Sequence, residues 1–294
     1  MNVAEIFKSF DDALKVSQDT RSTIAARHNR IARILNADFR YESNCTSNTL
    51  YVGSYGRGTA IDGISDIDML MILPYSIQQQ YTQYMGNGQS ALLQSVRKSL
   101  LGTYPNTDIK GDGQVVQVVF SDGTKFEVLP CFDNYDGSFD YPDSNSGGCW
   151  KQTYPKAEIE AFRNKNVECN NNLYSLCRMA RTWKYQCDVP LKSCLIDLFA
   201  YRFLSEWRHR DKSYLYYDYM MRDFFMYLKE IPLTQSSWFM VGSNRMYSDD
   251  GYFQYYAGLA YNNALEAISY QESDCDWSAH KKWREVFGNK FPSV

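Results

Sequence analysis

Two aspartates separated by one residue, Asp66 and Asp68, begin an apolar run that is typical of a β-strand. Alternate side chains of a strand point to the same face, so both carboxylates should project together while Ile67 and Met69 face the core. Neighbouring carboxylates repel each other, and each is costly to keep ionised unless a cation lies between them. Magnesium prefers oxygen ligands and meets this need. The aspartate pair therefore indicates a metal site.

A third acid, Glu127, lies inside another apolar run, after an Asp-Gly turn signal. Its neighbours Phe126 and Val128 should face the other way, and a two-residue turn would set Glu127 opposite Val118. The simpler alternative is an acid on the solvent face of its strand. Two metal ions about 4 Å apart can hold both the attacking and the leaving oxygen of an in-line phosphoryl displacement. We therefore predict that the three acids are catalytic and hold two Mg²⁺ or Mn²⁺ ions.

A glycine-rich run, Gly53–Thr59 (GSYGRGT), follows a short apolar strand and precedes the aspartates. Its bare backbone N–H groups can approach a phosphate closely, and a helix beginning there would add its positive end. It is not a Walker A loop, because no Gly-Lys-Ser/Thr follows. Nor is it a nucleophile elbow, because Val52 stands where that motif needs glycine. The residues of this run that we predict to bind nucleotide or phosphate are Gly53, Ser54 and Arg57.

Two polar residues of a later helical region are further candidates. Lys184 follows Ala180 by four residues and so lies on the buried stripe of its predicted helix, where a lysine either extends to the surface or meets an anion. Ser193 stands where the next helix should begin, and its ordinary role would be an N-cap. Arg57 also has two possible roles, because it can contact phosphate or pair with Asp62.

The elements that position these residues are predicted to form two lobes. The first ~38 residues have helical spacing, the segment 48–130 has strand patterns with one helix between them, and the chain from about residue 157 is helical almost throughout. A polar Gly-, Asp- and Ser-rich stretch, 133–150, is the expected linker or lid. The predicted domains are an α/β lobe that includes the long N-terminal helix, residues 1–150, and a helical lobe, residues 151–294. A ligand site is expected in the cleft between them.

Composition restricts the class of protein. The chain has 294 residues, a net charge of −3 and a pI near 5.7, which argues against a partner such as long nucleic acid. The sequence has no apolar run of about 18 residues, so no membrane span is predicted. The N-terminus lacks the pattern of a secretory signal. The eight cysteines contain no C-x-x-C pair, so we interpret them as reduced thiols. These features predict a cytoplasmic protein.

The glycine run and the acids together resemble a known family. GSYGRGTAIDGISDIDML, followed by the acid in FEVLP, is similar to the polymerase-β-like nucleotidyltransferases. The similarity is closer to the bacterial relatives of cyclic GMP-AMP synthase and oligoadenylate synthase, the CD-NTases with a SMODS-type domain. Segments such as LCRMARTWK, DKSYLYYDYMMRDFF and WREVFGNKFP extend it over nearly the whole chain. The sequence departs from many relatives at Glu127, where they have aspartate.

The resemblance implies an α+β fold: a polymerase-β-like lobe with a mixed β-sheet, and a C-terminal helical lobe. It implies an enzyme that makes a cyclic di- or trinucleotide second messenger from ATP, GTP or other nucleoside triphosphates, releasing pyrophosphate, in bacterial antiphage (CBASS) signalling. It also implies that Lys184 and Ser193 hold the triphosphate. The enzyme is expected to be a monomer, and a downstream effector is expected to respond to the product rather than bind the enzyme.

Two other functions remain to be compared. A transferase that moves a nucleotide to a small molecule, a protein or an RNA end would use the same metal site. An enzyme acting on RNA should show a basic face, which the acidic balance disfavours. A non-catalytic protein that only keeps the fold is disfavoured because the three acids and the glycine run occur together.

Overall fold

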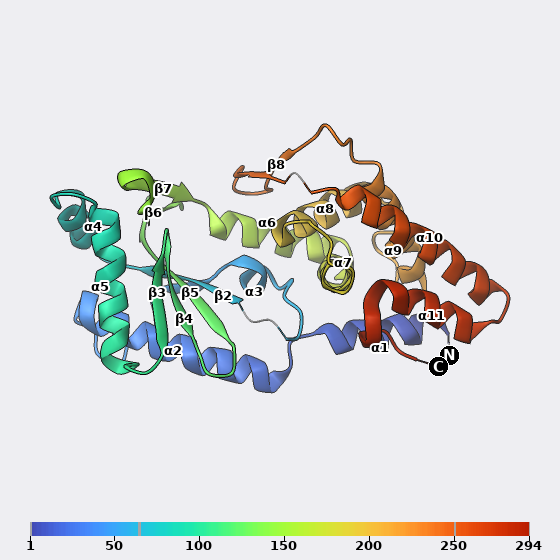
Figure 1. Cartoon of the computed structure of the whole chain (residues 1–294), viewed down its shortest axis with the longest axis horizontal. Coiled ribbons are helices and arrows are strands. Elements are labelled where there is room, and N and C mark those ends of the chain that lie inside the picture. The colour runs from blue at the N-terminus through green and yellow to red at the C-terminus, as the bar shows by residue number, and fades with distance from the viewer. Residues whose placement is uncertain (1, 64–65, 250, 294) are drawn as a thin grey trace. The chain divides into compact units, whose positions relative to one another are not determined.

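The computed structural model describes residues 2–63, 66–249 and 251–293 (Figure 1). The chain forms two compact units. The helical unit comprises Met1–Lys15, Thr59–Asp62 and Glu160–Val294, and the sheet unit comprises Val16–Gly58 and Gly63–Ile159. The structure therefore divides the chain differently from the predicted boundary at residue 150, and it assigns the first 15 residues to the helical unit.

The sheet unit is built on a mixed seven-stranded sheet with the order β1-β2-β5-β4-β3, to which β6 is added beside β5 and β7 beside β6. The central pair, β2 and β5, is parallel, and the other pairs are antiparallel. The mixed sheet and the separate helical unit confirm the predicted α+β class. The strands are β1 Thr49–Tyr51, β2 Asp66–Ile72, β3 Asp108–Asp112, β4 Val115–Val119, β5 Lys125–Asp133, β6 Phe139–Asp143 and β7 Cys149–Thr153.

Helices cover one face of this sheet. Apolar residues of α2 and α5 share a core cluster with Ile67, Met69 and Met71 of β2. Because strand side chains alternate, Asp66 and Asp68 lie on the opposite face, which carries a smaller apolar cluster. That face is therefore where the predicted site must lie. The helices of this unit are α2 Gln18–Arg40, α3 Gly53–Arg57, α4 Tyr75–Thr82 and α5 Gly88–Thr103, with a 3₁₀ turn η1 at Asn145–Gly147. Helix α6, Pro155–Glu168, begins here and ends in the helical unit.

The hairpin between β4 and β5 has a different register from the predicted one. Glu127 pairs with Gln117, not with Val118, so that prediction is wrong. The loop is one residue longer than a two-residue turn, because the Phe120 N–H bonds the Thr124 carbonyl at 2.9 Å. Gly123 has a φ of +87° and closes this three-residue loop.

The helical unit has a large aromatic core. Phe7 of α1 packs edge-on against Trp283 of α11 with a centroid distance of 5.3 Å, and Phe10 lies 4.8 Å from Phe287. These contacts explain why α1 belongs to this unit instead of continuing into α2. The helices are α1 Val3–Leu14, α7 Asn172–Gln186, α8 Ser193–Glu206, α9 Tyr217–Lys229, α10 Phe253–Glu272 and α11 Asp276–Phe287. The hairpin β8 Ser237–Phe239 with β9 Met246–Ser248 and the 3₁₀ turns η2 Tyr214–Tyr216 and η3 Gly288–Lys290 complete it.

Among the described residues, no helix has both the length and the apolar character that a membrane span requires. None of the eight cysteines, all within the described residues, is joined to another in a disulfide. Cys149 and Cys275 are exposed, whereas Cys131, Cys169 and Cys177 are buried.

Asp218, in the first turn of α9, gives a prediction for stability. Its burial raises the pKa of its carboxyl from 3.8 to about 6. The folded protein is therefore relatively more stable when Asp218 is protonated, and this advantage is lost as the pH rises through about 6. We expect Asp218→Asn, which cannot ionise, to increase the free energy of unfolding by on the order of 1 kcal/mol at about pH 7.5 and to change it little at about pH 4. Thermal denaturation at both pH values measures this, and an equal shift at both would contradict it.

Candidate active site

The three acids share one face of two adjacent strands. Asp66 and Asp68 lie on the same side of β2, while Ile67 between them is fully buried on the other side. The parallel register of β2 and β5 pairs Asp68 directly with Glu127, whose two chain neighbours are also fully buried. The register confirms that the two strands are adjacent and that Asp68 and Glu127 share a face, while the shared role of the three acids stays a prediction.

The electrostatics of the cluster centre on Asp68. Its burial, together with the neighbouring carboxylates of Glu127 and Asp66, raises the pKa of Asp68 to about 6. Arg57 and Lys125 act in the opposite direction. The protein has thus partly buried a carboxylate beside two others, an arrangement that favours the binding of positive charge.

One source of positive charge at the acid cluster is Lys125, which the sequence analysis did not identify. Lys125 lies opposite Asp66 in the parallel register, and its Nζ is 3.3 Å from Asp66 Oδ1 and 2.9 Å from Glu127 Oε1. In the described part of the chain, no three His, Cys, Asp or Glu side chains converge closely enough to hold a metal ion. The three acids have the ligand type that a divalent ion needs, and they lie on one face of adjacent strands. The carboxylates of Asp66 and Glu127, however, contact the ammonium of Lys125.

The glycine run lies directly against the acid cluster. Gly53 has a φ of +58°, and a Cβ on it would overlap the carboxylate of Asp68. The backbone N–H of Val52 donates to the Asp68 carbonyl at 2.9 Å, which fixes the start of α3 to β2. Gly53 thus lies against Asp68, and Ser54, the next residue, is half-buried.

Gly53→Ala is expected to lower the free energy of unfolding by about 2 kcal/mol or more and to suppress activity, because both its backbone angle and its space exclude a Cβ. Gly123→Ala is the matched control, since Gly123 also has a positive φ but a Cβ there would meet open space. We expect this control to lose about 1 kcal/mol and remain active. Denaturant unfolding of both variants measures the difference, and equal losses would contradict the close packing of Gly53 on Asp68.

Arg57 is buried, and its Nη1 lies 3.4 Å from Glu158 Oε2 on the first turn of α6. The sequence analysis did not foresee this pairing, and the two roles expected for Arg57, contact with phosphate and pairing with Asp62, stay predictions. The arginine also lowers the pKa of Asp68. Arg57 therefore supplies positive charge near the acid cluster.

Lys184 and Ser193 lie together in the helical unit. Lys184 Nζ donates to Ser193 Oγ at 3.1 Å, and both side chains are half-buried. The N-cap of α8 is Lys192, so the N-cap role expected for Ser193 is wrong: Ser193 is the first helical residue. Its hydroxyl is thus directed to the lysine instead of the helix backbone.

A buried hydrogen-bond network centred on Arg181 and Asp197 was not predicted from the sequence. Arg181 donates to both carboxylate oxygens of Asp197, at 3.1 and 2.7 Å, and to the Ser193 carbonyl at 3.2 Å. The Thr59 hydroxyl, at the end of the glycine run, donates to Asp197 at 2.7 Å. Thr59 and Asp197 are fully buried. The network fixes the start of α8 and anchors Thr59 in the helical unit.

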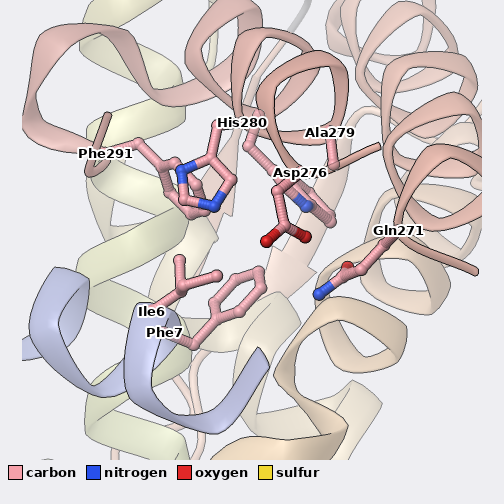
Figure 2. A pocket seen from close by; sticks show the side chains of 8 residues that line it. Ile6, Phe7, Gln271, Asp276, Ala279, His280 and Phe291 are labelled. Atoms are coloured by element: carbon pink, nitrogen blue, oxygen red, sulfur yellow. The ribbon is translucent and has the colours of Figure 1, made fainter. Parts of the chain in front are cut away.

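A shallow hollow in the helical unit contains none of the predicted site residues (Figure 2). Figure 2 shows Asp276 and Gln271 lying across it from Phe7. It is lined by Ile6, Phe7, Gln271, Asp276, Ala279, His280, Trp283 and Phe291. The candidate active site is therefore the acid cluster rather than this hollow.

Comparison with solved structures defines the fold. The chain matches the cyclic AMP-GMP synthase DncV of Vibrio cholerae with a TM-score of 0.72 at 14% identity, over 99% of this chain and 98% of that one. It matches the CD-NTase CdnG of Bradyrhizobium diazoefficiens, solved in complex with GTP, with a TM-score of 0.70 at 9% identity, over 97% and 94%. These similarities confirm the predicted polymerase-β-like nucleotidyltransferase fold.

The sequence identifies the family. The model of the Second Messenger Oligonucleotide or Dinucleotide Synthetase (SMODS) domain matches residues 1–166, so the chain belongs to this family of CD-NTases. A probable cyclic nucleotide synthase of Bacillus cereus strain VD146 is 24% identical, over 82% of this chain and 81% of the relative. The CBASS oligonucleotide cyclase CdnC of Escherichia coli strain KTE188 is 23% identical, over 76% and 71%. The predicted family is thereby confirmed.

Proposed function

We propose that this protein joins nucleoside triphosphates into a cyclic di- or trinucleotide second messenger and releases pyrophosphate. The observation that carries the proposal is the placing of three carboxylates on one face of β2 and β5, with that of Asp68 against Gly53. Family membership supports the reaction class. Relatives solved with ATP, with GTP and with the linear intermediate 5′-pppA(3′,5′)pG support triphosphate substrates and a two-step reaction.

In this proposal Asp66, Asp68 and Glu127 hold two Mg²⁺ or Mn²⁺ ions. The bound metal would neutralise phosphate charge and lower the pKa of the acceptor hydroxyl. Oxygen ligands of this type suit both ions. The buried setting of Asp68 supports the assignment, because a carboxylate kept beside two others is stabilised by a cation.

The other site residues hold the triphosphate. Gly53 and Ser54 offer backbone groups to the phosphates, and Arg57 adds charge beside them. Lys184 and Ser193, already hydrogen-bonded to each other, are assigned to the β- and γ-phosphates. A ribose hydroxyl then attacks the α-phosphate in line with the departing pyrophosphate. For a cyclic product, the linear intermediate turns over and reacts a second time.

We further infer that the enzyme acts in antiphage (CBASS) signalling as a cytoplasmic monomer that needs neither membrane nor long nucleic acid. CBASS cyclases among its relatives support the pathway. The effector is then expected to recognise the nucleotide product rather than the enzyme.

Mass spectrometry of the products tests the proposal. The purified chain is incubated with all four ribonucleoside triphosphates and Mg²⁺, and the products are treated with phosphatase. A phosphatase-resistant nucleotide with the mass of a cyclic species is expected, and nuclease pretreatment of the enzyme should not change its yield. Label transferred to a small molecule, a protein or an RNA end would overturn cyclisation, and unchanged triphosphates would overturn the enzymatic function.

Lys184→Met tests the phosphate contact. Loss of the ammonium is expected to raise KM for the triphosphate about 10-fold or more, because a charge-assisted hydrogen bond contributes roughly 1.5–3 kcal/mol. Steady-state kinetics measure KM and kcat separately. Lys8→Met is the control, because Lys8 is exposed and paired with Asp12 in the same unit. An unchanged KM in the Lys184 variant would remove Lys184 from the phosphate site.

A further inference from the structure

Lys125 has a position that the proposed reaction does not account for. It lies two residues before Glu127 on β5, so both side chains point to the same face, and it is the register partner of Asp66. Its ammonium contacts Asp66 at 3.3 Å and Glu127 at 2.9 Å. The lysine therefore lies between two of the three acids.

The surroundings of Lys125 favour this bridge. Its side chain is 25% exposed and that of Glu127 is 27% exposed, so solvent screens the contact less than it would a pair on the open surface. Within the described residues, Asp66 and Glu127 are the two ion-pair partners of Lys125. The compact ammonium offers three donors and can satisfy both carboxylates at once.

Asp68 differs from its two neighbours. In the described part of the chain it forms no ion pair, although it lies in register with Glu127. A divalent cation can thus take Asp68 directly as a ligand. To take Asp66 and Glu127 as well, it must compete with the ammonium for the same carboxylate oxygens.

We propose that Lys125 is a resident counter-ion of the acid cluster, which a divalent metal must displace from Asp66 and Glu127 before the centre is complete. This inference rests on the proposed function. The exchange replaces one positive charge by two, and it releases the ammonium beside the site. An anionic triphosphate is then the natural new partner for Lys125, so metal and nucleotide should assist each other's binding.

Manganese titration of the full chain, followed by electron paramagnetic resonance without nucleotide, tests the exchange at one fixed pH. We expect Lys125→Met to bind Mn²⁺ about 10-fold more tightly than wild type, because the competing charge is gone. Lys125→Arg keeps the charge and should remain weak. Lys110→Met is the matched control. Lys110 lies on β3 of the same sheet, and among the described residues its ion-pair partner is the exposed Asp108. It should bind Mn²⁺ as wild type does.

Adding a non-hydrolysable triphosphate completes the test. Wild type should then gain Mn²⁺ affinity by a larger factor than Lys125→Met does. Equal or weaker Mn²⁺ binding by the methionine variant, with its fold verified by circular dichroism, would overturn the role of Lys125 alone. Failure of both wild type and the variant to bind Mn²⁺, with or without triphosphate, would overturn the proposed metal centre as well.

Discussion

Asp68→Asn is expected to reduce the rate of nucleotide product formation by about 10³-fold or more, corresponding to roughly 4 kcal/mol in the activation free energy. Asparagine has nearly the same shape as aspartate, but it lacks the charge that a metal ligand of this kind needs. Product formation from radiolabelled triphosphates, followed with time, measures the loss. The effect should be large because Asp68 is at the centre of the cluster, beside Glu127 in register and beneath Gly53.

Folding must be separated from chemistry in this experiment. The Asp68→Asn variant should not unfold at a lower temperature than wild type, because the neutral amide removes both the burial of a charge and its repulsion by Asp66 and Glu127. Asp108→Asn is a matched control, since Asp108 lies on β3 of the same sheet and is exposed. It should remain fully active. If the Asp68 variant kept more than about a tenth of the wild-type rate, Asp68 would not be a metal ligand of the reaction.

Asp197→Ala is expected to lower the free energy of unfolding by about 3–5 kcal/mol, because it leaves the buried guanidinium of Arg181 without its carboxylate. The hydroxyl of Thr59 loses its acceptor in the same step. Guanidinium chloride denaturation measures the change. Thr59 ends the glycine run, so its release should also weaken triphosphate binding by that run.

Two further variants define the cause of this loss. Asp12→Ala removes an acid that pairs with Lys8 and Lys15 on the exposed side of α1, and it should cost less than about 1 kcal/mol. The double variant Asp197→Leu with Arg181→Leu removes both charges together. It should lose less free energy of unfolding than Asp197→Leu or Arg181→Leu alone. An Asp197→Ala variant as stable as wild type would show that the network does not hold α8.

The local arrangement of the aspartate pair could be predicted from sequence because it depends only on strand alternation. Asp66, Asp68 and the buried Ile67 follow from the pattern of one strand, whatever else the chain does. The adjacency of Glu127 is different, since β2 and β5 are parallel and are separated by two helices and two other strands. The strand pattern of Glu127 suggested a third acid from a neighbouring strand, the family resemblance supported it, and the predicted fold is confirmed.

The errors have local physical causes. The β4–β5 register was wrong by one residue because Gly123 takes the third loop position, a difference that an Asp-Gly pair alone does not specify. Ser193 was considered as an N-cap because serine suits that position, but Lys192 occupies it and the hydroxyl bonds Lys184. Helix ends are uncertain by a residue or two from sequence, and here one residue changed the role.

The missed residues are partners that only the tertiary structure brings together. Glu158 lies 101 positions from Arg57, and Asp197 lies 138 positions from Thr59, so no periodicity relates them. Lys125 is the exception. It shares the strand alternation of Glu127, and its charge on the same face was a signal for a counter-ion that the sequence already contained.

Anomalous X-ray diffraction from crystals grown with Mn²⁺ and a non-hydrolysable nucleoside triphosphate is the most direct test of the metal centre. We predict manganese peaks within bonding distance of the carboxylates of Asp66, Asp68 and Glu127, with the triphosphate bound to the same ions. Manganese located elsewhere, or a Glu127 side chain directed away from the two aspartates while triphosphate is bound, would contradict the metal centre on β2 and β5.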